Sequence, residues 1–252
     1  MKTTKYISIA IAVVMVASFV SCKKEQPAPA PIPNGTVGLH IHTSVNDVEL
    51  DSGSVAADAN GRKMKLNVAQ FYFVNVTLKK ADGSEVKLNN TSMKTIGEET
   101  YVLGQVPAGN YTGMSFQVGL DNATNQTQPS SHANTSVLAA QQPSMWFGTT
   151  SQGYIFMNIQ GYVDTTAAHN GNADQPFLVQ LGTATMLKTV NMPAKSFSVV
   201  GDQYYYLHLM ADYGMLLQGV NFKTSNVITP FNASASVAAQ IADNIPNMFM
   251  FE

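Results

Sequence analysis

Short runs of alternating apolar and polar residues, separated by turn-forming residues, constrain the fold of this chain most. In residues 36–43, Val37, Leu39 and Ile41 alternate with His40 and His42. A period of two is typical of a strand with one buried face. Further strands are predicted at residues 69–79, 85–88, 101–106, 111–119, 153–160, 177–182 and 203–213. Many short strands between Gly, Asn and Pro turns favour an all-β fold, an antiparallel β-sandwich, over βαβ units.

Two segments rich in Ala and Gln interrupt this pattern. Residues 135–142 and 234–242 are each predicted to form a short helix, because both residue types have good helix propensity. Residues 122–142 as a whole are polar and form a long connection, for which a binding role and disorder are both open interpretations. We therefore expect a sandwich with short helical insertions.

The N-terminal residues have the pattern of an export signal. Lys2 and Lys5 precede an apolar run at residues 7–16, which is shorter than the roughly 20 residues that span a bilayer. Residues 1–21 are therefore predicted to be a signal peptide. Small residues before Cys22, the only cysteine, resemble a bacterial lipobox. An accidental cysteine is the alternative, but a lone cysteine in a secreted chain has no internal partner, which favours lipidation at Cys22.

A stretch rich in Pro and Ala follows the cysteine. Residues 22–35 are predicted to form an extended tether, and residues 36–252 to form a single domain. Removing Lys2 and Lys5 from the 14 basic residues leaves 12 against 16 acidic ones. Such a mildly acidic chain offers nothing for nucleic acid. We expect a protein of the bacterial cell envelope, held at the outer membrane, on its periplasmic or surface side, by its lipid anchor alone.

Several sequence blocks, in a fixed order, carry a resemblance to a known family. The most specific one is residues 106–113, which continues into residues 115–121. The other blocks are residues 70–78, 80–83, Asn125, residues 144–147, 153–161, 241–244 and 248–251. Together they resemble the MbnP-like copper-binding family of bacterial envelope lipoproteins. The resemblance implies a β-rich sandwich domain, a secreted or lipidated location, and copper as the bound cofactor.

The only tryptophan lies in one of these blocks. The resemblance implies that Trp146 can be oxidised to kynurenine at a copper site by a di-haem, MauG-like oxidase partner. A buried structural ring with a hydrogen-bonded indole is the alternative. Three departures count against copper. Gln180 stands where many members have histidine, the tryptophan segment often holds two tryptophans, and Phe251-Glu252 replaces a histidine-bearing tail.

His40 and His42 are the candidate metal ligands. At positions i and i+2 of one strand they face the same way, and imidazole is a good ligand for copper. Two polar residues on a solvent-facing side are the alternative interpretation. His208 alternates with Leu207 and Leu209 and shares a face with Tyr206 and Met210. We expect His208 to be a hydrogen-bonded strand residue rather than a ligand.

Methionine is a second source of soft ligands in this sequence. Met145, Met248 and Met250 have thioethers that can bind copper, but methionine also fills gaps in protein cores. Packing is the favoured interpretation for all three.

Two functional hypotheses from different classes follow. The sequence contains no nucleophile elbow, phosphate loop or His-Glu-x-x-His motif, so the chain is not expected to be an enzyme. The leading hypothesis is an envelope lipoprotein that binds copper for storage, uptake or buffering. The alternative is a metal-free surface β-sandwich lipoprotein that binds a protein or glycan partner.

Overall fold

The computed structural model describes residues 32–252. The predicted signal peptide, the lipidation site Cys22 and residues 22–31 of the tether lie outside the described residues. The first strand begins at Asn34. Among the helices of the described part of the chain, none is long and apolar enough to cross a membrane.

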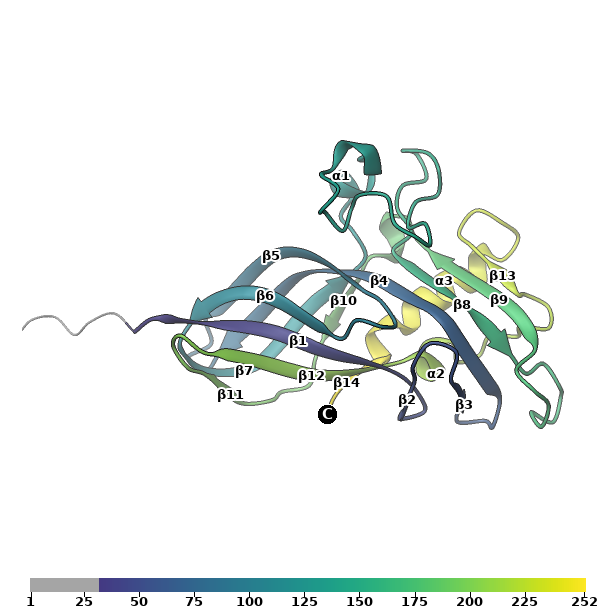
Figure 1. The fold of residues 1–252 in the computed structure, drawn as a ribbon, viewed down its shortest axis with the longest axis horizontal. Helices are drawn as coiled ribbons and strands as arrows, with labels where there is room; N and C mark the ends of the chain where they lie inside the picture. The colour runs from purple at the N-terminus through teal and green to yellow at the C-terminus, as the bar shows by residue number, and fades with distance from the viewer. Residues whose placement is uncertain (1–31) are drawn as a thin grey trace, which may run out of the picture. The chain divides into compact units, whose positions relative to one another are not determined.

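Two twisted β-sheets make up the domain (Figure 1). In the smaller sheet the strand order is β14-β12-β1-β2, and β6 pairs with the other side of β1. Its strands are β1 (Asn34–Val45), β2 (Val48–Glu49), β6 (Thr100–Pro107), β12 (Tyr204–Asp212) and β14 (Phe249–Phe251).

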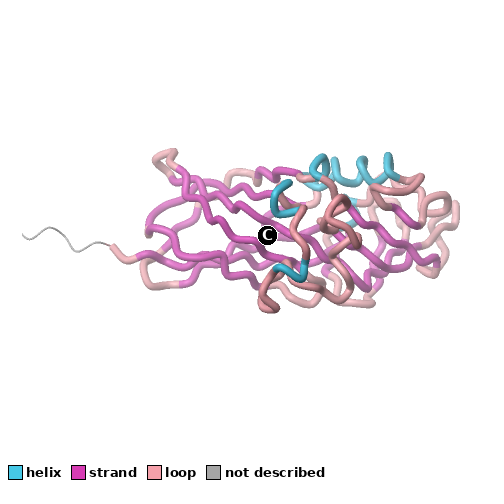
Figure 2. The backbone as a smooth tube through the Cα atoms, turned by 90° about the horizontal axis from the view of Figure 1, so that it is seen from above, coloured by secondary structure: helices cyan, strands magenta, loops and turns pink. Residues whose placement is uncertain are grey.

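The larger sheet has the order β10-β7-β4-β8-β9-β13, with β3 and β5 paired to β4 and β11 paired to β7. Its strands are β3 (Val55–Ala57), β4 (Lys63–Lys80), β5 (Glu85–Lys94), β7 (Gly109–Val118), β8 (Met157–Val163), β9 (Gln175–Leu181), β10 (Lys188–Asn191), β11 (Phe197–Val199) and β13 (Val227–Ile228). The predicted all-β sandwich is thus confirmed, and strands dominate the view in Figure 2.

Aromatic rings from both sheets form the core between them. Phe249 of β14 contacts Phe71 of β4 and Phe116 of β7, with ring centroids 5.6 and 5.0 Å apart. Tyr101 of β6 meets Phe73 of β4 edge to face at 5.4 Å. Edge-to-face pairs add to the free energy gained from burying apolar surface. This core fixes which face of each strand points outward.

One strand pair at the centre of the smaller sheet departs from the antiparallel pattern. β1 and β12 run parallel over nine residue pairs, from Thr36 opposite Tyr204 to Ser44 opposite Asp212. Parallel neighbours need a long crossover, and most of the domain lies between these two strands in the sequence. A second parallel pair joins β9 to β13. The sandwich is therefore mixed rather than purely antiparallel.

The described residues also form three short α-helices, α1 (Asn122–Asn125), α2 (Tyr213–Leu216) and α3 (Ala235–Asn244), and three single-turn 3-10 helices. The helix predicted at residues 234–242 is confirmed as α3. The helix predicted at residues 135–142 is wrong, since that segment forms turns. The hydroxyls of Tyr72 and Tyr154 donate to the carbonyls of Val137 and Leu138. Those tertiary hydrogen bonds satisfy backbone groups that a helix would have to satisfy itself.

Candidate metal centre

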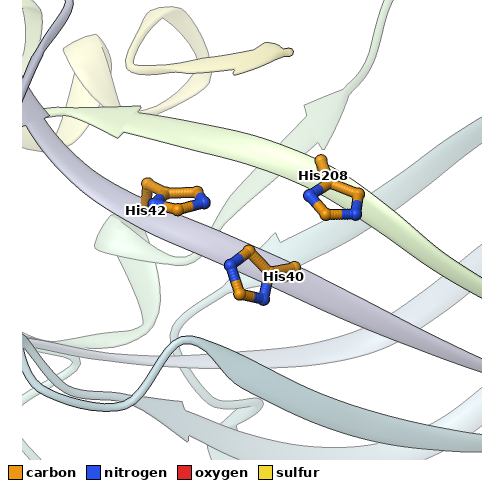
Figure 3. A group of neighbouring side chains, drawn as sticks. All are labelled: His40, His42 and His208. Carbon is orange, nitrogen blue, oxygen red and sulfur yellow. The ribbon is translucent and has the colours of Figure 1, made fainter.

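Three histidines meet on the outer face of the smaller sheet. His40 on β1 lies directly opposite His208 on β12, and His42 follows two residues later on β1. The ring centroids of His40 and His42 are 4.5 Å apart, and those of His40 and His208 are 5.0 Å apart. One ring nitrogen from each histidine lies within 4.8 Å of the other two (Figure 3). We call this group the histidine cluster.

The alternation of the strands places these side chains outward. Leu39 and Ile41 are fully buried, so His40 and His42 point away from the core. Leu207 and Leu209 are likewise buried, and the side chain of His208 is 52% exposed. The structure therefore brings together both histidines proposed from the sequence and adds a third.

His208 is the member that the sequence interpretation assigned to a structural role. Within the described residues its ring contacts a carboxylate of Glu252 rather than a hydrogen-bonding core residue. Its alternation with buried residues, on the same strand face as Tyr206 and Met210, could have indicated that the side chain points outward. What the sequence did not reveal was the register of a parallel pair whose two strands lie far apart in the chain.

Carboxylates surround the histidine cluster. Glu99, which precedes β6, lies 3.5 Å from His40 Nε2 and 3.6 Å from His42 Nδ1. Glu252 lies 3.6 Å from His42 Nε2 and 3.7 Å from His208 Nδ1. Thr100 Oγ1 lies 3.0 Å from His40 Nδ1 and fixes the orientation of that ring. The cluster therefore faces an acidic rim that attracts cations.

A tight hairpin supplies the third carboxylate. Asn46 and Asp47 both have positive φ, which suits the two-residue turns that join antiparallel strands. The turn pairs Ser44 with Glu49, and a Glu49 carboxylate oxygen lies 2.9 Å from His42 Nδ1. The hairpin turn thus places the carboxylate of Glu49 beside the imidazole of His42.

His42 is the cluster residue with the clearest electrostatic signature. Partial burial alone would lower its pKa, but the contact with Glu49 and the charges of Glu252, Glu49 and Glu99 outweigh burial and raise the pKa. A raised pKa means that a proton competes more strongly with a metal ion for this imidazole than for an ordinary histidine. The same negative charges favour a bound cation over an empty site.

A buried lysine supports the segment that carries Glu99. The side chain of Lys94 is fully buried. Its Nζ donates to Thr43 Oγ1 at 3.0 Å and to the carbonyls of Thr95 and Glu98 at 2.6 and 3.1 Å. Burial lowers the pKa of Lys94 to about 8, although the nearby charges of Glu99 and Glu98 oppose the shift. Lys94 therefore ties the β5–β6 turn to β1 behind the histidine cluster.

The donor set of the cluster fits copper. Three imidazoles can converge on one ion, and imidazole is a ligand that copper accepts. Glu49, Glu99 and Glu252 can orient the rings and balance the charge of the ion, as carboxylates do around metal-bound histidines. Zinc takes the same ligand types, so the imidazoles alone do not select between the two metals.

The tryptophan lies at a different place. Trp146 forms an isolated bridge with Tyr154, and their ring centroids are 5.0 Å apart. Both residues line a cavity of about 430 Å³ together with Met145, Gln141 and Thr149. No residue of the histidine cluster lines this cavity. The structure thus does not bring Trp146 to the candidate metal centre.

The other residues weighed from the sequence also lie elsewhere. Gln180, on β9 of the larger sheet, is paired with Asn158 and does not join the cluster. Met145 and Met248 are buried core residues, as the packing interpretation expects. Met250 is only partly buried and faces Met210 across the β12–β14 pair.

Comparison with known proteins identifies the family. The sequence model of the MbnP family matches residues 34–233. The solved structure of MbnP from Methylosinus trichosporium is similar, with a TM-score of 0.54 and 17% sequence identity. That match covers 81% of this chain and 83% of the other, and at this identity it demonstrates a shared fold. None of the curated proteins matches the chain. Because the family model covers most of the chain, the protein belongs to the MbnP family.

Proposed function

We propose that this protein binds copper in the bacterial cell envelope, through the imidazoles of His40, His42 and His208. The observation that carries the proposal is the register of β1 and β12, which sets His40 opposite His208 and leaves His42 beside them. The resemblance to the MbnP-like family supports copper as the metal. The proposed role is storage, uptake or buffering, without catalysis.

The acidic rim supports this role. Glu49, Glu99 and Glu252 each place a carboxylate oxygen within 3.7 Å of a cluster imidazole. Negative charge lowers the cost of bringing a cation to partly buried imidazoles. Since ligand histidines must be deprotonated, binding weakens when the solution becomes acidic.

The envelope location and the lipid anchor are part of the proposal. They rest on the predicted signal peptide and on Cys22, which lie outside the described residues. Intact mass of the protein from its native membrane tests both, because lipidation adds acyl mass at the new N-terminus. A Cys22→Ala variant is expected to leave the membrane fraction.

Oxidation of Trp146 by a di-haem, MauG-like partner is a separate prediction of the family resemblance. None of the cluster histidines lines the Trp146 cavity, so the cluster does not support this prediction. A peptide spectrum that shows the mass change of kynurenine at Trp146 tests it, independently of whether copper is bound.

Copper quantification tests the main proposal. The mature protein, purified from its native envelope, is expected to bind one equivalent of copper. A His40→Ala, His42→Ala, His208→Ala triple variant is expected to bind none with comparable affinity. His132→Ala is the matched control, because His132 lies outside the cluster and contacts Thr127 instead. Equal copper binding by the triple variant and the wild type would overturn the choice of ligands.

A second candidate function is supported by the Trp146 cavity. Its walls combine an aromatic ring with side-chain amides and hydroxyls, and no charged side chain lines it. Such a lining suits a neutral, polyhydroxylated ligand such as a glycan. Calorimetric titration with neutral oligosaccharides tests this candidate, and Trp146→Ala is expected to remove any binding.

A further inference from the structure

Two methionines continue the row of side chains that starts at His42. On the outer face of the smaller sheet, His42 of β1 lies opposite Met210 of β12, and Met210 lies opposite Met250 of β14. Residues directly paired across neighbouring strands point to the same face of the sheet. The row therefore presents one imidazole and two thioethers side by side.

The neighbouring row contains His40, His208 and Glu252, and no methionine. His208 lies opposite His40, and the backbone N–H of Glu252 donates to the His208 carbonyl at 3.2 Å, which continues the β12–β14 pairing. The two rows are adjacent on β1 and β12, because His40 and His42, like His208 and Met210, are two residues apart. Met210 therefore borders both His42 and His208 on the same face.

The placement of these two methionines differs from that of the methionines in the core. Met145 and Met248 are buried almost completely, whereas Met210 and Met250 are only partly buried on the outer face. A methionine that fills a core gap faces the core, so packing does not account for a cross-strand methionine pair on the outer face. The inner positions of the same strands are taken by Leu209 and Phe249.

We propose that Met210 and Met250 supply thioether sulfur to the metal held by the histidine cluster, and that they make the site selective for Cu(I). This inference rests on the proposed copper function and deepens it. Thioether sulfur is a soft ligand that favours Cu(I), whereas Cu(II) and Zn²⁺ are well served by imidazole and carboxylate. A mixed set of imidazole and thioether thus discriminates between metals that imidazole alone would bind alike.

Two of the three rim carboxylates, Glu49 and Glu99, reach the cluster from the side away from the methionines. Glu49 approaches His42 from the β2 hairpin, and Glu99 approaches His40 and His42 from the start of β6. The methionines flank the cluster from β12 and β14, on the opposite side of β1 from β6. The ion is thereby offered sulfur from β12 and β14, while Glu49 and Glu99 orient the rings from the other side of β1. Glu252, which follows β14, contacts His42 and His208 from the side of the methionines.

X-ray absorption and competition titrations test the inference on the mature protein. The Cu(I)-loaded wild type is expected to show a copper–sulfur scattering path. A Met210→Leu, Met250→Leu double variant is expected to lose that path and to bind Cu(I) at least about tenfold more weakly, the lower limit typical for loss of a group that supports a metal site. Its affinity for Zn²⁺ is expected to stay unchanged. Met215→Leu, a surface methionine on α2, is the control.

The possible failures are distinguishable. Copper binding with nitrogen and oxygen scattering alone would overturn the thioether proposal and leave the proposed copper function standing. Equal Cu(I) affinities of the double variant and the wild type would do the same. Absence of copper binding by the wild type at one equivalent would instead overturn the proposed function itself. Circular dichroism of the double variant confirms that its fold is retained.

Discussion

His42 Nδ1 lies 2.9 Å from a carboxylate oxygen of Glu49, across a two-residue hairpin turn. Burial lowers the pKa of His42, but the contact with Glu49 and the surrounding carboxylates outweighs burial, so that the pKa is raised above its ordinary value. A group with a raised folded-state pKa stabilises the fold most at low pH, and that contribution is lost as the pH rises through the folded-state pKa.

Glu49→Gln is therefore expected to lower the pKa of His42, because it removes the nearest negative charge while keeping the shape of the side chain. Titration of the His42 imidazole by NMR in the absence of metal checks this. Glu85→Gln, an exposed substitution on β5, is the control and should leave the titration unchanged. An unaltered His42 pKa in Glu49→Gln would contradict the assignment of Glu49 as the main partner.

His208→Ala is expected to weaken copper binding about 10- to 100-fold, in line with the usual cost of disturbing a metal site. The side chain of His208 is 52% exposed, so the free energy of unfolding should change by no more than about 0.5 kcal/mol. Competition titration against a chromophoric chelator measures the affinity, and thermal unfolding measures the stability. His169→Ala, which lies outside the cluster, should leave the copper affinity unchanged. Full affinity in His208→Ala would limit the ligands to His40 and His42.

The buried side chain of Lys94 is expected to make the free energy of unfolding rise with pH in the alkaline range. Burial lowers its pKa from 10.5 to about 8, so between these values the unfolded chain binds more protons than the folded one. Stability therefore rises with pH in this range, by about 1.5 kcal/mol between pH 8 and 9.5. Urea unfolding followed by the fluorescence of Trp146 measures this rise.

Lys94→Met should abolish the alkaline rise, and it should also leave the carbonyls of Thr95 and Glu98 without their donor. Lys87→Met, at an exposed position of the same strand, serves as the control and should retain the rise. Above pH 10, buried tyrosines such as Tyr72 and Tyr101 act in the opposite direction, because burial raises their pKa in the folded state. A flat wild-type profile between pH 8 and 9.5 would mean that Lys94 is not deprotonated in the fold.

Gly161 permits the close approach of β8 to β4. A Cβ at this position would overlap the backbone carbonyl of Lys65, beside the register shift between Leu66 and Val68. Gly161→Ala is expected to destabilise the protein by about 1–3 kcal/mol, the usual cost of overpacking. Gly97→Ala, where a Cβ meets open space, is the matched control. Equal melting temperatures for the two variants would contradict the close approach.

Local patterning predicted most of the fold. The alternation of Val37, Leu39 and Ile41 with the histidines correctly identified the inner and outer faces of β1. The strands predicted at residues 69–79 and 85–88 lie in β4 and β5, which pair with each other. These features depend on neighbouring residues, so a single sequence contains the information for them.

Long-range pairing explains what the sequence did not reveal. His208 joins His40 only through a parallel register between strands near the two ends of the domain. The failed helix at residues 135–142 has the same kind of cause, because the hydroxyls of Tyr72 on β4 and of Tyr154 donate to its carbonyls. Neither relationship leaves a periodic trace in the sequence.

The parallel pairing of β1 with β12 also couples assembly of the candidate metal centre to the folding of nearly the whole domain. His40 and His42 are synthesised early, but they can meet His208 only after nearly the whole domain has been synthesised. A ligand that binds the folded state alone stabilises that state by mass action. A metal ion held by all three histidines would therefore stabilise the pairing of β1 with β12, and a chain that lacks β12 could not form the three-histidine site.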